Sequence, residues 1–524
     1  MTTTTSGAQV RGRGRGRRGK KGAKQDPIVA GVRWLDERLG VAKGGRTLLD
    51  KIFPDHWSFL LGEIALYSFV VLVATGVFLS LYFVPSASEI IYHGAYAPLR
   101  GSKVSAAFAS TVNLSFGVRS GLVIRQMHHW AADVFVGAIA VHMCRIFFTG
   151  AFRKPRELNW MIGITLLILA LTNGFIGYSL PDDLVSGTGL RIMFSIVLSI
   201  PVVGSYLAIF LFGGNFPGDG SIIPRLFIVH VLVVPLIILG LLAAHLGLLV
   251  RQKHTQFPGH GRTEKNVVGS PMYPTFIAKT TGFLFVTTGV LWALGGLAQI
   301  NPIWQFGQYE PYKISYAVQP DWYMGWLDGA LRIMPPWSFH AFGHTLPFVV
   351  FFPAVLFPGI CFNLFYAWPY VEKKLTGDNA EHNLLDRPRD KPRRTAIGVA
   401  SLAFFFTLFA ASSTDVLANY FKISLNEVLW FFRFAVFIVP TIAGFFAYYL
   451  CREMSGVPGI GRRKRAVVIT RTATGEYESV SSAPRPGDSG EELAPTPVPA
   501  RIELNGELEP AEAVTSGVRR IPRR

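Results

Sequence analysis

Long apolar stretches separated by polar loops follow one another along most of the chain. A helix needs about 20 predominantly apolar residues to cross the hydrocarbon core of a bilayer. Eight stretches reach that length, and the pattern predicts a membrane-spanning helix in each of them. They cover roughly residues 58–84, 122–148, 158–180, 222–250, 275–298, 342–367, 395–413 and 425–450. The expected fold class is therefore an all-α polytopic membrane protein with eight transmembrane helices.

Three further segments depart from this pattern. RIMFSIVLSIPVVG, at residues 191–204, is apolar but too short to span a bilayer, so we expect one or two helices there at the membrane interface. Residues 1–25 are rich in Gly, Arg and Lys, and residues 466–524 are rich in Pro, Ser and Glu. Such compositions cannot build a core, and both tails are predicted to be disordered. The N-terminal tail has no apolar core, so we expect no cleavable signal peptide.

Lysine and arginine are unevenly distributed between the loops. The N-terminal tail, the loops after the second, fourth and sixth predicted helices, and the chain after the eighth are all dense in Lys and Arg. The alternate loops, at 85–121, 181–221, 299–341 and 414–424, are poorer in these residues for their length. Because Lys and Arg are enriched in cytoplasmic loops, we predict that both termini lie in the cytoplasm. The basic N-terminal tail would then face anionic lipid headgroups.

Composition narrows the function class. Half of the 524 residues are hydrophobic and 16% are charged, while the formal net charge is +18. The basic residues lie between apolar blocks and in the tails, which indicates a membrane protein with basic flanks and argues against a nucleic-acid binder. Cys144, Cys361 and Cys451 are far apart, and no CxxC or CxxCH occurs. This argues against zinc motifs, thiol redox pairs and covalent c-type haem.

Histidines are regularly spaced on two of the predicted helices. His128 and His142 are fourteen residues apart on the second, and His230 and His245 are fifteen apart on the fourth. At about 100° per residue, these steps return to within about 40° and 60° of the starting face, roughly 21 Å further along the axis. The two helices run in the same direction. We therefore predict two stacked bis-histidine sites, His128 with His230 toward the outer surface and His142 with His245 further in.

Imidazoles on both faces of an iron porphyrin are a known haem arrangement, so the spacing predicts two non-covalent b-type haems. An intramembrane histidine can instead be a hydrogen-bonded core residue or part of a proton path. Two pairs at matched depth favour haem over that alternative. His129 lies about 100° round the helix from His128, so we expect it to pack or form hydrogen bonds without ligating the haem.

Glycines repeat the same period on the first and third predicted helices. Gly62 and Gly76 are fourteen apart, as are Gly163 and Gly177. Helix glycines often serve helix–helix packing in membranes. Because they recur at the depths of the histidines, and a missing Cβ permits close approach, we interpret them as the places where porphyrin edges pass.

Two arginines flank the histidine pairs. Arg125 lies one turn before His128, and Arg145 lies three residues after His142. Haem propionates are anionic and are stabilised by guanidinium groups, so each arginine is a candidate partner for the nearer haem. For Arg145, extension toward the cytoplasmic headgroups is an equal alternative.

Several short motifs show a resemblance to a known family. They are RQMH with His142, GYSLP at 177–181, PRLFIVHVLVVP at the start of the fourth helix, and QPDWY at 319–323. With them, roughly residues 45–450 resemble the cytochrome b subunit of the respiratory cytochrome bc1 family. QPDWY corresponds to the PEWY motif of that family. The fifteen-residue gap is similar to the cytochrome b6 branch, while the PDWY form and the two tails resemble the actinobacterial subunit.

The resemblance implies a reaction and a set of partners. In that family quinol is oxidised at an outer site, and one electron passes to a Rieske iron–sulfur protein and a c-type cytochrome. The other electron crosses through the two haems to a quinone at an inner site, and protons are translocated. The actinobacterial form implies menaquinone, an aa3-type oxidase supercomplex, a homodimer and a location in the bacterial plasma membrane.

The resemblance also assigns residues to the two quinone sites. Those at the outer site are Asp321, Tyr323, Trp322, Pro320 and Gly189. Quinol oxidation needs a base, and Asp321 stands where the family has a glutamate. By itself PDWY could equally be an interfacial turn with an aromatic anchor.

At the inner site, the resemblance assigns Lys279. The family has a Lys-Asp pair before the fifth helix, but here Thr280 follows Lys279. Proton delivery must therefore differ, through Lys279, His254 or water.

We divide the chain into four parts on these grounds: a basic tail at 1–30, a dihaem four-helix domain at 31–255, a second domain with the PDWY loop at 256–452, and a cytoplasmic tail at 453–524. Two alternative functions stay open. One is a dihaem membrane anchor of a quinone-linked dehydrogenase or hydrogenase, which usually has four or five helices. The other is a transporter with histidines in a proton path, which would be colourless.

Overall fold

The computed structural model describes residues 27–39, 45, 48–313, 319–341, 343–455, 466–471 and 477–482. Tertiary contacts divide the chain into two units, Met1–Val457 and Pro458–Arg524. The predicted tail at 1–25 and most of the one at 466–524 lie outside the described residues.

Eight helices of the first unit are long and apolar enough to cross a membrane. They are Trp57–Ser80 (η1 and α3), α5 Gly121–Thr149, α6 Glu157–Tyr178, Ile222–Gln252 (α9, η3 and α10), Met272–Leu297 (η4 and α11), Phe348–Thr376 (α14, η6 and α15), α16 Pro392–Ala411 and α18 Leu425–Met454. Each coincides with a predicted span, so the prediction of an eight-helix all-α membrane protein is confirmed. The sixth begins later than predicted because residues just before it pair as two short strands.

The remaining elements are short. Those before the fourth span are α1 Pro27–Leu39, β1 Ile52–Phe53, β2 Glu89–Ile91, η2 Ala97–Leu99, β3 Lys103–Ser105, α4 Ala106–Gly117, α7 Leu184–Leu198 and α8 Gly204–Phe212. Those after it are β4 Ser270–Pro271, α12 Ile303–Phe306, η5 Trp322–Met324, α13 Gly325–Ile333, β5 Phe339–Ala341, β6 His344–Leu346, η7 Pro388–Asp390, α17 Thr414–Phe421, β7 Ala466–Arg471 and β8 Tyr477–Ser482. The strands form four antiparallel pairs, β1–β4, β2–β3, β5–β6 and β7–β8.

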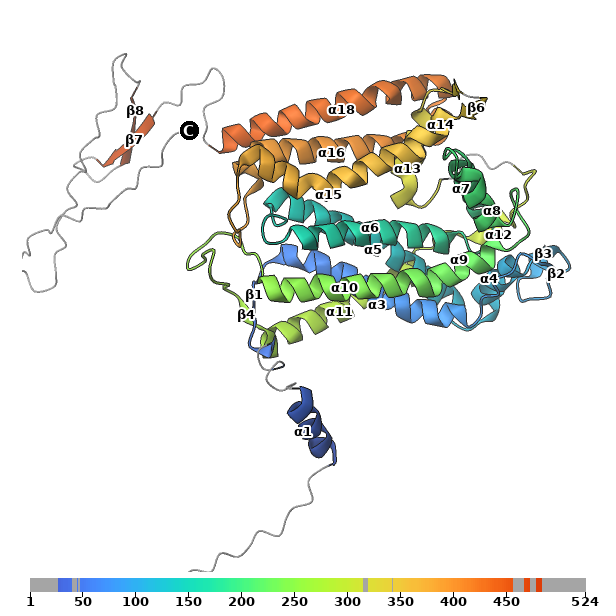
Figure 1. Ribbon diagram of the computed structural model, residues 1–524, viewed down its shortest axis with the longest axis horizontal. Helices are drawn as coiled ribbons and strands as arrows, with labels where there is room; N and C mark the ends of the chain where they lie inside the picture. Colours follow the sequence, from blue (N-terminus) through green and yellow to red (C-terminus); the bar gives the residue numbers. More distant parts are fainter. Residues whose placement is uncertain are drawn as a thin grey trace, which may run out of the picture. The chain divides into compact units, whose positions relative to one another are not determined.

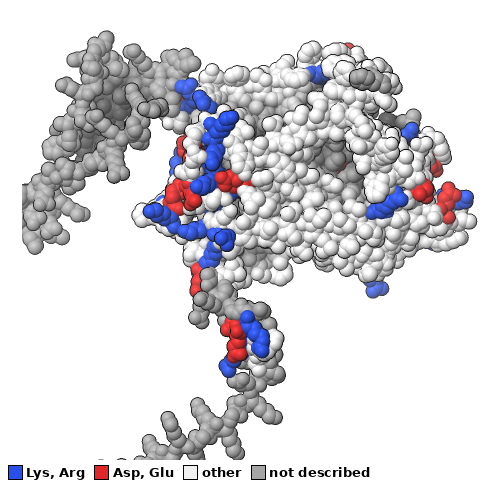
Figure 2. Space-filling view, in the orientation of Figure 1, with Lys and Arg blue, Asp and Glu red and all other residues white. Residues whose placement is uncertain are grey.

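The long helices lie alongside one another, and consecutive ones run in opposite directions (Figure 1). At one end of this bundle lie β1 and β4, and at the other lie α4, α7 and α8. We call these the β1 end and the α7 end. Charged side chains gather toward the two ends, whereas the flank seen between them is almost free of charge (Figure 2). That distribution is expected of helices whose outer faces contact lipid.

One or two helices were predicted at 191–204, and the structure has two in this region, α7 and α8, of which α8 begins at Gly204. α7 begins at Leu184, earlier than predicted, because Asp183 caps it. The Asp183 carboxylate accepts hydrogen bonds from the backbone N–H groups of Val185 (3.1 Å) and Ser186 (3.4 Å), and the Ser186 hydroxyl oxygen accepts one from the backbone N–H of Asp183 (3.1 Å). This reciprocal capping satisfies donors that the first helical turn would otherwise leave free.

Disorder was predicted for the whole segment 466–524, and this is wrong for β7 and β8. They pair in register from Ala466 with Ser482 to Arg471 with Tyr477. β7 contains the β-branched run Val467–Thr470, which favours an extended backbone. The composition of the tail as a whole masked this local preference.

One core cluster lies within the first four spans. It joins Ala65 and Phe69 of α3 to Phe135 and Ala138 of α5, together with Leu166, Ala170, Val234 and Ile238 from the other two spans. Along each helix these residues fall between the two levels marked by histidine or glycine. The core is therefore an apolar layer that separates the two predicted haem levels.

Candidate functional site

The first histidine pair lies in the half of the bundle nearer the α7 end. The ring centroids of His128 on α5 and His230 on η3 are 6.2 Å apart, with the ring planes at 77°. Two metal–imidazole bonds of about 2 Å each, one on either side of an iron, would separate the ring centroids by about 6 Å. The two rings therefore stand at the spacing that one haem iron requires.

His230 lies in a short π-helical segment, η3, between α9 and α10. A π-helical turn contains one residue more than an α-helical turn. The spacing of fifteen on this span therefore reaches the same depth and face as the spacing of fourteen on α5. In a regular helix, His245 would be turned about 60° away from the face of His230, and the extra residue in η3 compensates for this rotation.

The second pair, His142 on α5 and His245 on α10, lies toward the β1 end. The two imidazoles are close enough to interact electrostatically. The Nδ1 atoms of both lack a hydrogen-bond partner of ordinary geometry among the described residues, although the Asn159 carbonyl lies beside His245. The inner pair thus repeats the arrangement of the outer pair, with one histidine from each of the same two spans.

The outer pair has hydrogen bonds that orient its rings. His128 Nδ1 lies 2.9 Å from the Thr75 hydroxyl, and Thr75 Oγ1 in turn donates to the Val71 carbonyl (2.6 Å). His230 Nδ1 lies 3.1 Å from the Asn173 carbonyl oxygen. A metal-ligating histidine characteristically donates its other ring N–H in this way. In both rings Nε2 is thereby left as the atom available to an iron.

The four predicted glycines each face one of the four histidines. A Cβ added to Gly76 would lie 3.2 Å from Cε1 of His128, and one added to Gly177 would lie 2.3 Å from Cε1 of His230. The corresponding distance is 3.2 Å from Gly62 to His142 and 3.7 Å from Gly163 to His245. The glycines therefore leave room for the imidazole rings of the histidines. The sequence had predicted that they leave room for the edges of the porphyrins.

Of the two predicted arginines, Arg125 is buried and Arg145 is half-buried, and both are only partly bonded. Arg125 donates through Nη2 to the Asn301 carbonyl (3.0 Å), and its Nε has no partner among the described residues. Arg145 lies with its guanidinium carbon 4.3 Å from the Phe59 ring centroid, and both Nε and Nη2 lack partners there. Unsatisfied guanidinium donors beside each histidine pair fit the anionic propionates of a haem.

A cavity of about 390 Å³ opens beside the outer histidine pair. Its walls include His128, His230, Arg125, Asp321 and Tyr323. The predicted base and the predicted haem ligands therefore share one cavity, although they come from segments far apart in the sequence.

Asp321 is held by two side chains. Its carboxylate oxygens lie 3.0 and 3.1 Å from Nε2 of His129, and the Tyr323 hydroxyl donates to Oδ2 (3.0 Å). Tyr323 is buried, with 3% of its surface exposed, and burial raises its pKa well above the usual value. Tyr323 is therefore a neutral hydrogen-bond donor at physiological pH.

His129 and Asp133 complete this cluster, and the sequence had not assigned them to the site. One ligand-type atom from each of His129, Asp133 and Asp321 lies within 4.8 Å of the others. The expected hydrogen-bonding role of His129 agrees with its bond to Asp321. Asp133 stands one turn after His129 on α5, so a search for ionisable residues on the His129 face would have found it.

Three residues assigned to the outer site are not among those that line the cavity. Trp322 is 43% exposed, and its ring approaches Gly137 of α5. Gly189 on α7 packs against Tyr178, which does line the cavity, and Pro320 precedes Asp321 in the loop.

At the β1 end, Lys279 pairs with a residue that the sequence reasoning missed. Its ammonium donates to the Asp55 carboxylate (2.9 Å), beside the β1–β4 strand pair, and the Ser270 hydroxyl bonds the same carboxylate. The hydrogen bonds from Ser270 and Lys279 lower the pKa of Asp55. His254 does not join this group: it is 7% exposed, and its ring packs against Phe53 at 4.3 Å between centroids.

Thr280, which stands where the resemblance leads one to expect an aspartate, bonds instead to a glutamate of another helix. Its hydroxyl donates to Oε2 of Glu63 on α3 (2.7 Å), and the Tyr67 hydroxyl donates to the same oxygen (3.1 Å). No motif or spacing in the sequence connects these positions.

The chain is similar in sequence to characterised bacterial subunits. A family model described as "Cytochrome b(N-terminal)/b6/petB" matches residues 133–308. The chain is 49% identical over 436 residues to the cytochrome bc1 complex cytochrome b subunit of Streptomyces coelicolor. The aligned region covers 83% of this chain and 78% of that protein. It is 51% identical over 442 residues to the subunit of the same description in Mycobacterium tuberculosis, with 84% and 79% covered.

A third relative, in Corynebacterium diphtheriae, has the same description and is 51% identical over 441 residues, with 84% of this chain and 80% of that protein covered. Among solved structures, a chain of "Hyperthermophilic respiratory Complex III" matches with a TM-score of 0.58 and 21% identity, covering 80% of this chain and all of that chain. At that identity the likeness concerns the fold. None of these relatives is a membrane anchor of a dehydrogenase or hydrogenase.

Proposed function

Because the chain belongs to the family of cytochrome b subunits of the cytochrome bc1 complex, we propose that it oxidises quinol at one side of the membrane and reduces quinone at the other. It acts within a proton-translocating quinol:cytochrome c oxidoreductase. The α7 end is the outer side and the β1 end is the cytoplasmic side, because Lys and Arg are denser in the loops at the β1 end. Both termini are then cytoplasmic, in a bacterial plasma membrane.

His128 and His230 would hold one b-type haem, and His142 and His245 would hold the other. The ring spacing of the outer pair, the approach of His142 and His245 to glycines of neighbouring helices and the incompletely bonded Arg125 support this assignment. When bound, the two haems supply one-electron redox centres at two depths in the membrane. The protein orients the outer ligands through Thr75 and the Asn173 carbonyl.

Oxidation of a quinol breaks two O–H bonds and releases two protons and two electrons. We assign one of the protons to the Asp321 carboxylate, which acts as general base. His129 and Tyr323 hold that carboxylate in place, and Tyr323 remains a donor because burial keeps its hydroxyl neutral. The observation that carries the proposal is that Asp321 shares a cavity with the outer histidine pair.

The chain needs partners to complete the reaction. Its three cysteines have no spacing that could ligate an iron–sulfur cluster. One electron of each quinol therefore passes to a Rieske iron–sulfur subunit and then to a c-type cytochrome subunit. The resemblance to actinobacterial relatives further supports menaquinone as substrate, a homodimer, and association with an aa3-type oxidase. Lipid surrounds the apolar flanks, and nucleic acid is not a partner.

Replacing Asp321 tests the outer site. In Asp321→Asn we expect quinol-driven cytochrome c reduction by the assembled complex to fall by about 10²- to 10⁴-fold, the usual contribution of a general base. The reduced-minus-oxidised spectrum should still show two b-type haems with distinct potentials. The exposed Asp219, replaced in the same way, is the control and should keep full turnover. Unchanged turnover in Asp321→Asn would remove this residue from the mechanism.

A further inference from the structure

A carboxylate and two hydroxyl groups join α3 to α11 near the β1 end. The hydroxyl groups of Thr280 and Tyr67 both donate to Oε2 of Glu63, and the two hydroxyl oxygens lie against each other. Tyr67 is 7% exposed, whereas Glu63 and Thr280 are half-buried. Oε1 of Glu63 has no hydrogen bond within the described part of the chain, so one carboxylate oxygen is held and the other is available.

This cluster lies at the level of the inner histidine pair. Glu63 directly follows Gly62, and a Cβ on Gly62 would lie 3.2 Å from Cε1 of His142. Since α3 packs along α5 and α11 in this region, Glu63 stands on the α11 side of the inner pair. It is therefore placed between the proposed inner haem ligands and the first turn of α11 (Ile277–Leu297), which carries Lys279 and Thr280.

The cluster is connected to the aqueous end of the bundle by charged groups. Lys279 precedes Thr280 and pairs with Asp55, and the side chains of the two are 57% and 49% exposed. On the α5 side, Arg145 carries unpartnered guanidinium nitrogens, and His142 faces Gly62. These are the charged and titratable groups on the elements packed around Glu63 at this end of the bundle.

We propose that Glu63 is the group that gives a proton to quinone at the inner site, in place of the carboxylate that position 280 lacks. This inference rests on the function proposed above. Reduction of a quinone to quinol takes two electrons and two protons, and it turns two C=O bonds into C–O–H groups. The electrons come from quinol oxidised at the outer site. The O–H bond of protonated Glu63 breaks as one quinone O–H bond forms, and the second proton comes from water beside Lys279.

After this transfer the Glu63 carboxylate takes up a proton from water at the cytoplasmic side. Thr280 and Tyr67 hold its Oε2 in place by donating hydrogen bonds to it. Oε1 is then the oxygen that is free to exchange a proton, because the two hydroxyl groups restrain Oε2.

The alternative is that Glu63 has only a structural role and joins α3 to α11. The experiment must distinguish this role from proton donation. Glu63→Gln keeps a carbonyl oxygen that can accept from Thr280 and Tyr67, but it has no proton to give. Tyr67→Phe removes one of the hydrogen bonds and leaves the carboxyl group. If Glu63 only joins the helices, Tyr67→Phe should slow reoxidation of the inner haem more than Glu63→Gln does. If Glu63 donates the proton, Glu63→Gln should slow it more.

The experiment uses the assembled complex in lipid nanodiscs. Reoxidation of the inner haem by added quinone should slow by about 10²-fold or more in Glu63→Gln, the size of a general-acid contribution. The first turnover of quinol oxidation at the outer site should keep its rate. An infrared reduced-minus-oxidised difference spectrum should lose a protonated-carboxyl band in Glu63→Gln. The exposed Glu453→Gln at the same end is the control for both readouts.

A rescue variant makes the outcome specific to the carboxyl group. Glu63→Gln combined with Thr280→Asp returns a carboxyl group to the cluster and should recover most of the reoxidation rate. Wild-type reoxidation and an unchanged infrared spectrum in Glu63→Gln would overturn the inference while leaving the proposed function intact. If the wild-type complex itself shows no quinol oxidation or no pair of b-type haems, the proposed function fails instead.

Discussion

At the scale of single residues, the buried ionisable groups fall into two kinds. Some have their hydrogen bonds completed by the protein, as Asp321 does through His129 and Tyr323. Others, such as Arg125 and Arg145, keep buried atoms without partners in the described part of the chain. A buried polar atom left unpaired costs about 1–3 kcal/mol, so the second kind indicates places where a ligand completes the structure.

Replacing one inner ligand should remove one haem. In His142→Ala we expect the haem content, measured as pyridine haemochrome per polypeptide, to fall to half of the wild-type value. The reduced spectrum should keep the band of the outer haem. His129→Gln is the matched control, since His129 bonds to Asp321 and should leave the haem content unchanged. Full haem content in His142→Ala would exclude this residue as a ligand.

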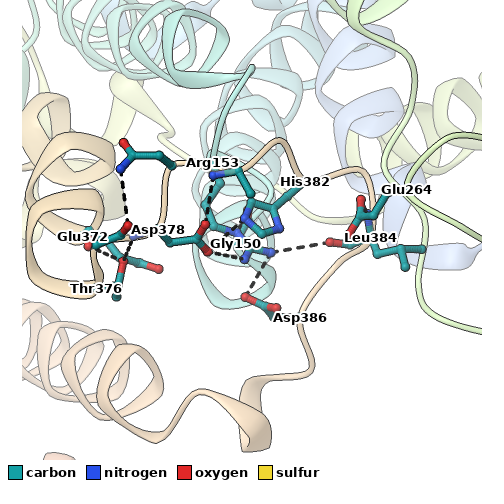
Figure 3. A network of polar contacts seen from close by, with 12 residues as sticks. Gly150, Arg153, Glu264, Glu372, Thr376, Asp378, His382, Leu384 and Asp386 are labelled. Atoms are coloured by element: carbon teal, nitrogen blue, oxygen red, sulfur yellow. Dashed lines mark hydrogen bonds and ion pairs between the residues drawn. The ribbon is translucent and has the colours of Figure 1, made fainter. Parts of the chain in front are cut away.

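At the scale of elements, a network of ion pairs at the β1 end joins the loop after α5 to the loop between α15 and α16 (Figure 3). Arg394 donates through Nη1 to Asp386 (2.7 Å) and through Nε to the two oxygens of Glu372 (3.0 and 2.9 Å). Arg153 reaches Asp386 as well, at 3.1 Å. The side chains of Arg394 and Glu372 are only 4% and 11% exposed, so each charge depends on its partner.

Breaking this network from one side should be strongly destabilising. Arg394→Met leaves the buried Glu372 without its partner and leaves Asp386 paired with Arg153 alone, and we expect the free energy of unfolding to fall by about 3–5 kcal/mol. Arg389→Met, at an exposed pair, should change it by less than about 1 kcal/mol. Differential scanning fluorimetry of the complex compares the two. Equal melting temperatures for the two variants would contradict the argument.

The double change Arg394→Met with Glu372→Met replaces the pair by apolar side chains. This variant should recover part of the stability lost in Arg394→Met, because position 372 then no longer carries a buried charge without a partner.

At the scale of the whole molecule, the first unit is layered along the helices. The outer histidine pair and its cavity lie toward the α7 end, an apolar core follows, and the inner pair and the ion pairs lie toward the β1 end. The β1–β4 pair brings the segment before the first span against the segment before the fifth. His254 is buried at that junction with Nε2 unpartnered among the described residues.

The burial of His254 should make stability depend on pH. Burial first, and then the charges of Lys51 and Arg156, lower its pKa to about 4. The unfolded chain, with a pKa of about 6.5, binds the proton at higher pH than the folded chain does. Stability should therefore be complete above pH 6.5 and decline as the pH falls toward 4, by up to about 3 kcal/mol.

His254→Phe keeps a ring against Phe53 and should flatten this dependence. The measurement is the apparent melting temperature between pH 4 and 7 for wild type, His254→Phe and the exposed control His260→Phe. A pH profile of His254→Phe that coincides with the wild-type profile would show that another group is responsible.

Much of the architecture follows from local pattern. The eight spans and the depths of the histidines and glycines depend only on apolar length and on rotation per residue along a helix, and the structure agrees with them. The tail hairpin was missed because composition averaged over a long segment hides a short β-branched run.

The sequence by itself determined which helices cross the membrane and at what levels four imidazoles lie, because both are properties of one helix at a time. Only the tertiary structure decided which distant side chains meet. His129 and Asp321 are 192 residues apart and Glu63 and Thr280 are 217 apart, yet each pair shares a hydrogen bond. Such contacts depend on how helices rotate and pack against one another, and no period within a single helix contains that information.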